Sequence, residues 1–197
     1  MDKPDTSEKN LCNLNTFDGN FVRDLIESGK DIFGGEALQS IKSCVQCGCC
    51  TGSCPSSRRT ALRTRKIFRE TVLGFEKNVI ESEDLWLCTT CYTCYERCPR
   101  GVKTTDIIRL LRNMSVKKGH MADAHRLTAS YVFKTGHGVP VNDEAQKQRN
   151  ELGLTKLPPT THSYPEALKS VQEILKLTGF DEIVGFDWNT MELRGNK

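Results

Sequence analysis

The chain lacks the long apolar segments of a membrane-spanning or secreted protein. No stretch approaches the ~18 consecutive apolar residues that a spanning helix requires, and the first ten residues contain no apolar segment typical of a secretory signal peptide. We therefore expect a cytoplasmic protein in which cysteine thiols stay reduced. Direct contact with a membrane is not expected and would have to come through a partner.

Aromatic residues and net charge are also scarce. Aromatic residues make up 7% and hydrophobic residues 37% of the 197 positions, which is little material for a large apolar core. Bound metal could compensate, because metal–thiolate bonds formed on folding contribute folding free energy directly. The formal net charge of +3 is too small to indicate nucleic-acid binding, and the basic run over 58–69 lacks the interleaved aromatic residues typical of such binding. We expect no nucleic-acid partner.

Motifs for substrate chemistry are missing as well. The pair Gly34-Gly35 and the pair Gly136 and Gly138 lack the strand–turn–helix context of a phosphate-binding loop. No paired carboxylates and no nucleophile–base arrangement stand out, and the four histidines are scattered. We therefore predict that the chain contains no catalytic residue.

Cysteine is the residue in excess, with ten copies. Eight of them form two runs with the same spacing, C-x2-C-x2-C-x3-C, and a proline closes each run. The first run is Cys44, Cys47, Cys50 and Cys54, and the second is Cys88, Cys91, Cys94 and Cys98. This spacing is typical of bacterial ferredoxins that bind two [4Fe–4S] clusters.

In such ferredoxins the fourth cysteine of each run binds the other cluster. Applied to this chain, the rule assigns a first cluster to Cys44, Cys47, Cys50 and Cys98. It assigns a second cluster to Cys88, Cys91, Cys94 and Cys54. Each closing proline interrupts the local turn, which helps to direct the fourth cysteine toward the other site.

Two other uses of the cysteines are less favoured. A structural zinc ion would need only four of the eight thiols, and a disulfide framework would normally follow a secretory signal. Cys49 adjoins Cys50, and neighbouring side chains cannot easily face one cluster. We expect Cys49 to be a buried thiol outside the ligand set, and Cys12 to be a free structural thiol.

The spacing of apolar residues predicts a mainly α protein. We expect a helix from Asp18 that Gly29 ends, and a helix over 58–73 capped by Ser56 or Ser57. A further helix capped by Thr104 should run to Gly119, and another should cover 120–135. The sequence S-Y-P-E at 163–166 fits a capping box that opens a helix ending at Gly179. The tail after it would expose Phe180, Phe186 and Trp188.

Basic residues gather next to the fourth cysteines. Arg58 and Arg59 follow Cys54, and Arg97 and Arg100 flank Cys98. A cluster held by four thiolates is negatively charged, so these cations would raise its reduction potential. The basic run over 58–69 is either a solvated helix face or a docking surface for an acidic partner.

A helix rather than a short hairpin separates the two runs, and this arrangement resembles the α-helical ferredoxins. The segments CVQCGCCTGSCP at 44–55 and LCTTCYTCYERCPRGV at 87–102 resemble the C-type iron–sulfur subunits of the methanogen heterodisulfide reductases. The resemblance is strongest over 36–135, which we take as an α-helical ferredoxin domain. Residues 1–35 would then be an N-terminal extension with a short helix, and 136–197 a C-terminal extension that binds partners.

This resemblance implies two partners within the heterodisulfide reductase. A flavin-containing subunit would donate electrons, often with a hydrogenase or formate dehydrogenase behind it. A separate catalytic subunit would reduce the coenzyme M–coenzyme B heterodisulfide at clusters held by Cys-Cys-Gly motifs, whereas Cys49-Cys50 is followed here by Thr51. The chain would thus relay single electrons from the flavin-containing to the catalytic partner in methanogenesis.

Two alternatives stay open at this point. The chain could be the iron–sulfur subunit of another oxidoreductase, of the succinate dehydrogenase, glycolate oxidase or glycerol-3-phosphate dehydrogenase type. It could also be a zinc-stabilised interaction module without a redox role.

Overall fold

The computed structural model describes residues 17–194 and is mainly helical, as the sequence predicts. The chain divides into two compact units, the first ending at His120 and the second beginning at Met121. The α-helices of the first unit are α1 Phe21–Phe33, α2 Gly35–Gln39, α3 Cys49–Gly52, α4 Thr64–Val72, α5 Glu76–Ile80, α6 Thr93–Glu96 and α7 Thr104–Lys117. Its 3-10 helices are η3 Ser40–Ser43, η4 Ser56–Arg58 and η5 Glu83–Leu87.

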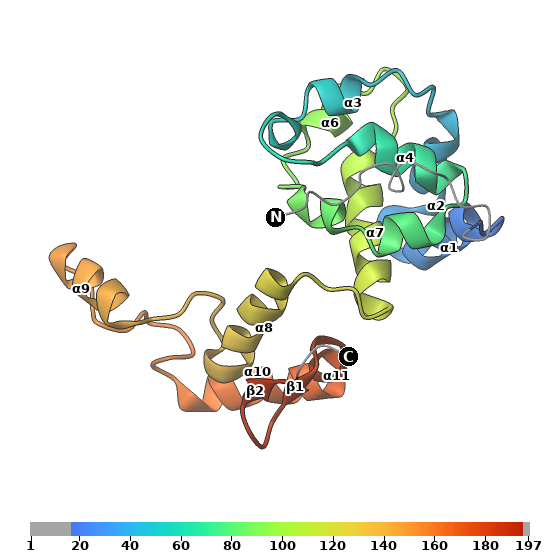
Figure 1. Ribbon diagram of the computed structural model, residues 1–197. Helices are drawn as coiled ribbons and strands as arrows, with labels where there is room; N and C mark the ends of the chain where they lie inside the picture. The colour runs from blue at the N-terminus through green and yellow to red at the C-terminus, as the bar shows by residue number, and fades with distance from the viewer. Residues whose placement is uncertain (1–16, 195–197) are drawn as a thin grey trace, which may run out of the picture. The chain divides into compact units, whose positions relative to one another are not determined.

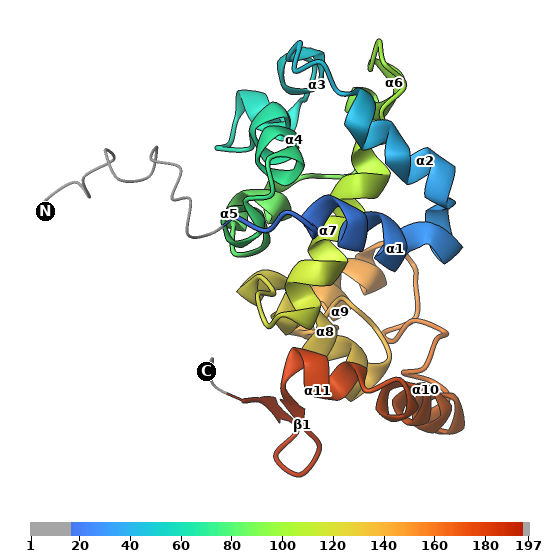
Figure 2. The ribbon, with the colours of Figure 1, turned by 90° about the vertical axis from the view of Figure 1, so that its right-hand side faces the viewer.

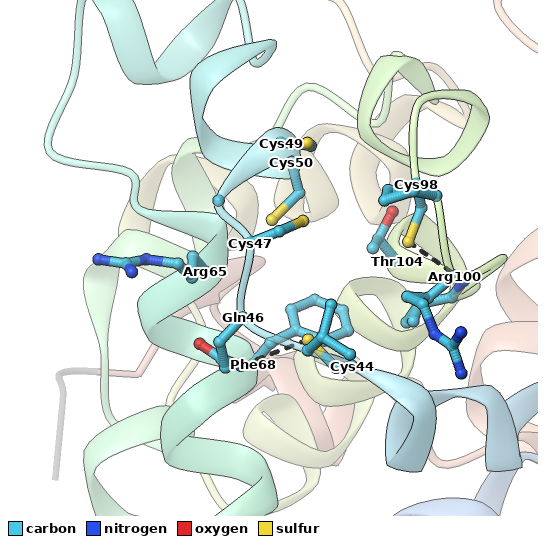
Figure 3. Close-up of a pocket in the computed structure, with 14 residues that line it drawn as sticks. Cys44, Gln46, Cys47, Cys49, Cys50, Arg65, Phe68, Cys98, Arg100 and Thr104 are labelled. Atoms are coloured by element: carbon cyan, nitrogen blue, oxygen red, sulfur yellow. Dashed lines mark hydrogen bonds between the residues drawn. The ribbon is translucent and has the colours of Figure 1, made fainter.

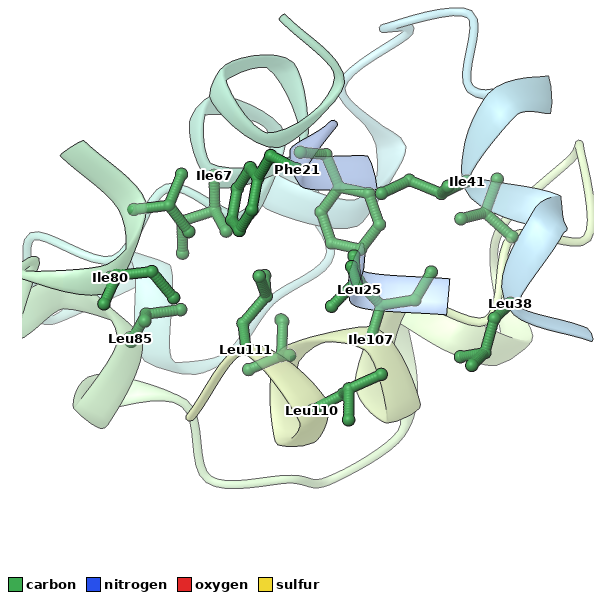
Figure 4. Packing of buried hydrophobic residues seen from close by; sticks show 14 of the residues in the cluster. Phe21, Leu25, Leu38, Ile41, Ile67, Ile80, Leu85, Ile107, Leu110 and Leu111 are labelled. Atoms are coloured by element: carbon green, nitrogen blue, oxygen red, sulfur yellow. The ribbon is translucent and has the colours of Figure 1, made fainter. Parts of the chain in front are cut away.

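Helix α7 is the centre of the first unit. Figures 1 and 2 show it passing through that unit with α1, α4 and α5 around it. Apolar residues recur along it at helical spacing, and Ile107 and Leu111 are fully buried. They pack with Phe21 of α1 and Ile67 of α4 in one continuous core (Figure 4). Helices α3 and α6, which belong to the two cysteine runs, lie side by side at one end of this unit.

Gly29 lies inside α1 and does not end it, contrary to the prediction. The helix continues to Phe33, and Gly34 at φ 79° ends it instead. A Cβ atom at Gly29 would lie 2.4 Å from Leu110 Cδ2 and 2.8 Å from Leu38 Cδ1. The glycine is therefore present because α1, α2 and α7 approach closely there, a contact that local sequence does not reveal.

The helix predicted over 58–73 begins six residues later, as α4. Ser56 does not cap it, because its hydroxyl donates to the Leu87 carbonyl at 2.7 Å. The cap comes from α3: the backbone N–H of Arg65 donates to Thr51 Oγ1 at 2.8 Å. The start of α4 is thus determined by a residue of the first cysteine run.

The second unit contains α8 Asp123–Thr135, α9 Asp143–Glu151, α10 Pro165–Leu177, α11 Phe180–Val184 and the antiparallel strands β1 Phe186–Asp187 and β2 Glu192–Leu193. The core of the second unit is aromatic. The prediction that the C-terminal tail exposes its aromatic residues is therefore wrong. Phe186 stacks on Phe133 with ring centroids 4.6 Å apart, and both are buried. Phe180 and Trp188 pack against the same cluster. The predicted capping box is also wrong, since Ser163 Oγ donates to the Pro158 carbonyl.

The two compact units do not coincide with the three segments expected from the sequence. Helix α1, from the expected N-terminal extension, contributes Phe21 and Leu25 to the first core. Helix α8, from the expected ferredoxin domain, belongs to the second unit. Cys12 lies outside the described residues. Over 17–194, none of the helices combines the length and apolar character needed to cross a membrane.

Candidate metal centre

The two cysteine runs have the same backbone conformation. In the first run Gln46 and Gly48 have positive φ angles of 57° and 86°, and in the second Thr90 and Tyr92 have 51° and 61°. These pairs occupy equivalent places, two and four residues after the first cysteine of each run. A short helix follows in both, α3 and α6. The sequence repeat is therefore also a structural repeat.

The positive φ angles at three non-glycine residues mark both runs as strained. Such a conformation costs on the order of 1 kcal/mol for most residues, and a β-branched residue such as Thr90 adopts it rarely. Strain of this kind concentrates at functional sites, where the surrounding structure maintains it. Here it lets the chain curl tightly, so that successive cysteines turn toward one side.

One hollow brings together four of the eight predicted ligands. It is lined by Cys44, Cys47 and Cys50 of the first run and by Cys98 of the second. About 370 Å³ there is free of protein atoms, part of it open to solvent. Figure 3 shows the sulfurs of these residues arranged around the middle of the hollow. The remaining wall includes Phe68, Val102, Thr104 and the arginines Arg65 and Arg100.

The other four predicted ligands differ in their burial. Cys54 and Cys94 are buried, Cys88 is half-buried and Cys91 is exposed. Cys54 packs in the same core as Cys88, and the Ser56 hydroxyl, two residues after Cys54, donates to the carbonyl of Leu87, next to Cys88. Cys54, from the first run, therefore lies beside the second run. The structure gives no contact between Cys91 and the other three.

Cys49 is exposed, which corrects the prediction of a buried thiol. It is the first residue of α3, and its thiol hydrogen-bonds with that of Cys47. It lies at the edge of the same hollow, on the solvent side. The physical reason is the start of the helix at this residue, which turns adjacent side chains in different directions.

Several sulfurs accept hydrogen bonds from the surrounding chain. The Val102 N–H donates to Cys98 Sγ at 3.3 Å, and Gln46 Nε2 donates to Cys44 Sγ at 3.3 Å. The Thr104 hydroxyl donates to Cys94 Sγ at 3.1 Å. Thr104 is therefore a sulfur donor and not the predicted helix cap, since α7 has Lys103 at its N-cap. Such donors stabilise thiolates and adjust the potential of a bound cluster.

Burial raises the pKa of some cysteines, and hydrogen bonds lower the pKa of others. Burial raises the pKa of Cys50 to about 11, and burial also raises the pKa of Cys88. A hydrogen bond from the Cys49 backbone lowers the pKa of Cys47, and the hydroxyl of Thr93 lowers the pKa of Cys91. Metal binding must therefore displace protons from the inner thiols, so affinity should fall at low pH.

Arg112 is a site residue that sequence reasoning missed. Its guanidinium donates to the carbonyls of Leu85 and Cys88, and it lies over the Trp86 ring with 5.6 Å to the centroid. It thereby attaches the start of the second run to α7. Its only sequence signal is an arginine on the apolar helix α7, which is too common a feature to single it out.

The donors fit an iron–sulfur cluster. Within 17–194, no three His, Cys, Asp or Glu side chains are placed to hold one single metal ion. The four thiols lie around the hollow instead, with hydrogen-bond donors directed at two of their sulfurs. Four cysteine thiolates are the ligand set of a [4Fe–4S] cluster.

Comparisons with known proteins agree with this chemistry. Residues 40–102 match the family model of the 4Fe-4S dicluster domain. The chain is 53% identical over 173 residues to the C-type iron–sulfur subunit of the CoB–CoM heterodisulfide reductase of Methanopyrus kandleri, covering 88% of this chain and 90% of that relative. It is 51% identical over 184 residues to the second C-type iron–sulfur subunit of the same enzyme from Methanocaldococcus jannaschii, covering 93% and 98%.

A third relative carries a longer name. The C2 component of the H2/formate:CoB–CoM heterodisulfide,ferredoxin reductase of Methanococcus maripaludis is 50% identical over 174 residues, which cover 88% of this chain and 94% of that protein. The family resemblance predicted from the cysteine segments is thereby confirmed. The chain belongs to the family of C-type iron–sulfur subunits of CoB–CoM heterodisulfide reductase.

Proposed function

We propose that the chain holds two [4Fe–4S] clusters with crossed ligands. The first set is Cys44, Cys47, Cys50 and Cys98, and the second is Cys88, Cys91, Cys94 and Cys54. The hollow lined by the first set is the observation that carries this proposal, because Cys98 comes from the other run. The packing of Cys54 and Cys88 in one core, with the Ser56 hydroxyl bonded to the Leu87 carbonyl, supports the second set.

We further infer that the chain is a non-catalytic electron relay. A bound [4Fe–4S] cluster takes up and releases one electron. The residues of this chain would hold the clusters and adjust their potentials through sulfur hydrogen bonds and nearby arginines. The two sets also adjoin, since α3, which contains Cys50, lies beside α6, which contains Cys94. An electron could thus pass between the sets without leaving the first unit.

The proposed direction of transfer is from the flavin-containing partner to the catalytic partner. The flavin-containing partner would receive electrons from a hydrogenase or formate dehydrogenase, and the catalytic partner would reduce the heterodisulfide. Family membership supports the presence of partner subunits. The name of the Methanococcus maripaludis relative, which includes H2 and formate, supports these two electron sources.

The metal content of the purified chain tests the relay. Two clusters require about eight iron and eight acid-labile sulfide per chain, from the composition of the [4Fe–4S] unit. Zinc in place of iron, with no sulfide, would contradict the proposal. Reduction of the clusters by the flavin-containing partner, followed by electron delivery to the disulfide-reducing partner, would then test the direction.

Single substitutions test the crossed ligands. Cys98→Ser should damage the cluster of the first run, and Cys54→Ser that of the second, as seen by EPR spectroscopy and iron content. Cys49→Ser is the matched control, because it removes a neighbouring thiol outside both sets and should leave both clusters bound. If each fourth cysteine served its own run, the proposed assignment would be wrong.

A further inference from the structure

A second hollow, here called the arginine groove, opens between the two cysteine runs. Its lining combines residues that follow Cys54 with residues of the second run: Ser53, Pro55, Ser56, Arg58, Arg59, Thr89, Thr93 and Arg97. About 950 Å³ there is free of protein atoms, much of it open to solvent. A smaller hollow shares Ser53 and Arg97 with it and extends to the exposed Cys49. The groove lining contains three arginines and no acidic residue.

Two of the three arginines, Arg58 and Arg59, belong to the 58–69 run, in which Arg63 and Lys66 behave differently. Arg63 donates to the backbone carbonyls of Ser57, Thr60 and Leu62, so it stabilises the turn before α4. Lys66 lies 3.9 Å from Glu70 in an ion pair. These two basic groups therefore already have partners within the chain.

Arg58, Arg59 and Arg97 have no such partners. All three are exposed, and within 17–194 none forms an ion pair or a side-chain hydrogen bond. Three unpaired cations in one groove repel one another, so an anion in the groove would be stabilised by all three. Arginine is also the side chain best suited to bind carboxylates in pairs of hydrogen bonds.

The groove is lined by residues next to members of the second ligand set. Thr89 and Thr93 flank Cys91, and the Thr93 hydroxyl hydrogen-bonds with its thiol at 3.4 Å. Cys91 is also the exposed member of that set. A partner seated in the groove would therefore contact the chain where the second set comes closest to solvent.

We propose that the arginine groove receives an acidic segment of the partner subunit that exchanges electrons with the second cluster. This inference rests on the proposed electron relay and adds the place and the chemistry of one docking contact. Charge complementarity selects a carboxylate-rich protein segment, and Ser53, Ser56, Thr89 and Thr93 supply hydroxyl groups that can hydrogen-bond with it. The contact steers the partner toward the second set before the apolar parts of the interface form.

The test uses the full chain with its co-expressed partner subunits. A triple variant, Arg58→Gln, Arg59→Gln and Arg97→Gln, removes the charge without adding a repulsive one. Its matched control is Arg23→Gln, Lys77→Gln and Lys117→Gln, three exposed basic residues of the same unit outside the groove. Iron content and EPR spectra are recorded first, and only variants with both clusters enter the comparison.

We expect the groove variant to associate with its partner at least about tenfold more slowly at low ionic strength, with a flattened dependence on salt. The control should behave like the wild type. A groove variant that matches the wild type in rate and salt dependence would overturn the proposal, and so would a control that loses as much as the groove variant. Sulfate binding in the groove with unchanged partner association would show a small-anion site and overturn it too.

A second measurement does not depend on weakening the complex. Arg97→Lys keeps the positive charge and introduces a primary amine. A water-soluble carbodiimide joins this amine to a contacting carboxylate as an amide, and the reagent takes up the water that is released. We expect a cross-link to an acidic peptide of the partner, and the absence of any such cross-link in an intact complex would contradict the proposal. If the wild-type complex carried no electrons to the heterodisulfide, the relay would fail, whereas these binding results would still decide the groove.

Discussion

Two sulfur atoms of the second run accept hydrogen bonds from residues that lie four and ten positions further along the sequence. The Thr104 hydroxyl reaches Cys94 Sγ, and the Val102 N–H reaches Cys98 Sγ. A hydrogen bond to a thiolate ligand stabilises the more negative, reduced cluster more than the oxidised one. These residues are therefore positioned to raise the potentials of the two sets separately.

Thr104→Val should lower the reduction potential of the second cluster. We take the lost hydrogen bond to favour the reduced form by ~0.5–1 kcal/mol. The reduction potential should then fall by about 20–45 mV, because 59 mV corresponds to a tenfold change in the equilibrium constant of a one-electron couple. An EPR-monitored redox titration measures this shift. Thr71→Val is the control: Thr71 is equally buried, but its hydroxyl donates to the Ile67 carbonyl. An unchanged potential in the Thr104 variant would contradict the assigned role.

The conformation of the first run offers another test at the residue scale. Gly48 has φ 86°, and a Cβ there would meet only Arg65 Cδ, at 3.7 Å. Since space is available, Gly48→Ala should cost only the strain of a positive φ, ~1–2 kcal/mol. We expect the first cluster to be lost sooner in denaturant, while the second is affected less. Gly52→Ala, in open space and inside α3, is the matched control and should retain the wild-type rate.

At the scale of elements, the helices follow the spacing of apolar residues, but their ends do not. Helix α7 begins and ends close to the predicted positions, because its apolar residues recur regularly and Gly119 follows it. Helix α4 starts late and α1 runs past Gly29. In both cases a contact from a distant element decides the boundary: Thr51 caps α4, and Leu110 packs on Gly29.

Gly29→Ala should therefore destabilise the first unit, although alanine favours helices by ~1 kcal/mol. The added methyl group would overlap with the buried side chains of Leu110 and Leu38, and overpacking costs ~1–3 kcal/mol. We expect faster loss of visible cluster absorbance in denaturant. Gly35→Ala is the matched control, since the nearest atom to its Cβ is Lys30 Cβ at 3.8 Å. Equal or greater stability in the Gly29 variant would show that the helices can separate at little cost.

At the scale of the whole molecule, the eight proposed ligands and the core beside them belong to the first unit. The Ser115 hydroxyl donates to the carbonyls of Ile80 and His120, and so connects α7 with α5 and with the last residue of this unit. The second unit has its own aromatic core and exposes large apolar side chains, including Leu152 at 75% and Leu177 at 88%. We expect these exposed side chains to contact partner subunits.

A chain ending at His120 should consequently retain both clusters. We expect iron content and EPR spectra like those of the full chain, together with weaker association with the partner subunits. Gel filtration of the co-expressed subunits measures the association. Loss of iron on truncation would show that the second unit supports the clusters, and unchanged association would show that its exposed apolar residues do not bind the partners.

The sequence alone determined the cluster chemistry, the mainly helical class and the family, because ligand spacing and apolar periodicity are local patterns. The same spacing produced the repeated backbone of the two runs, including the positive φ angles after Cys44 and Cys88. Tertiary structure decided which thiols share one hollow, how Gly29 is packed and that Phe186 is buried. It also separated the free arginines of the groove from Arg63 and Lys66. These outcomes depend on contacts between residues that are far apart in the sequence, and local sequence patterns do not reveal such contacts.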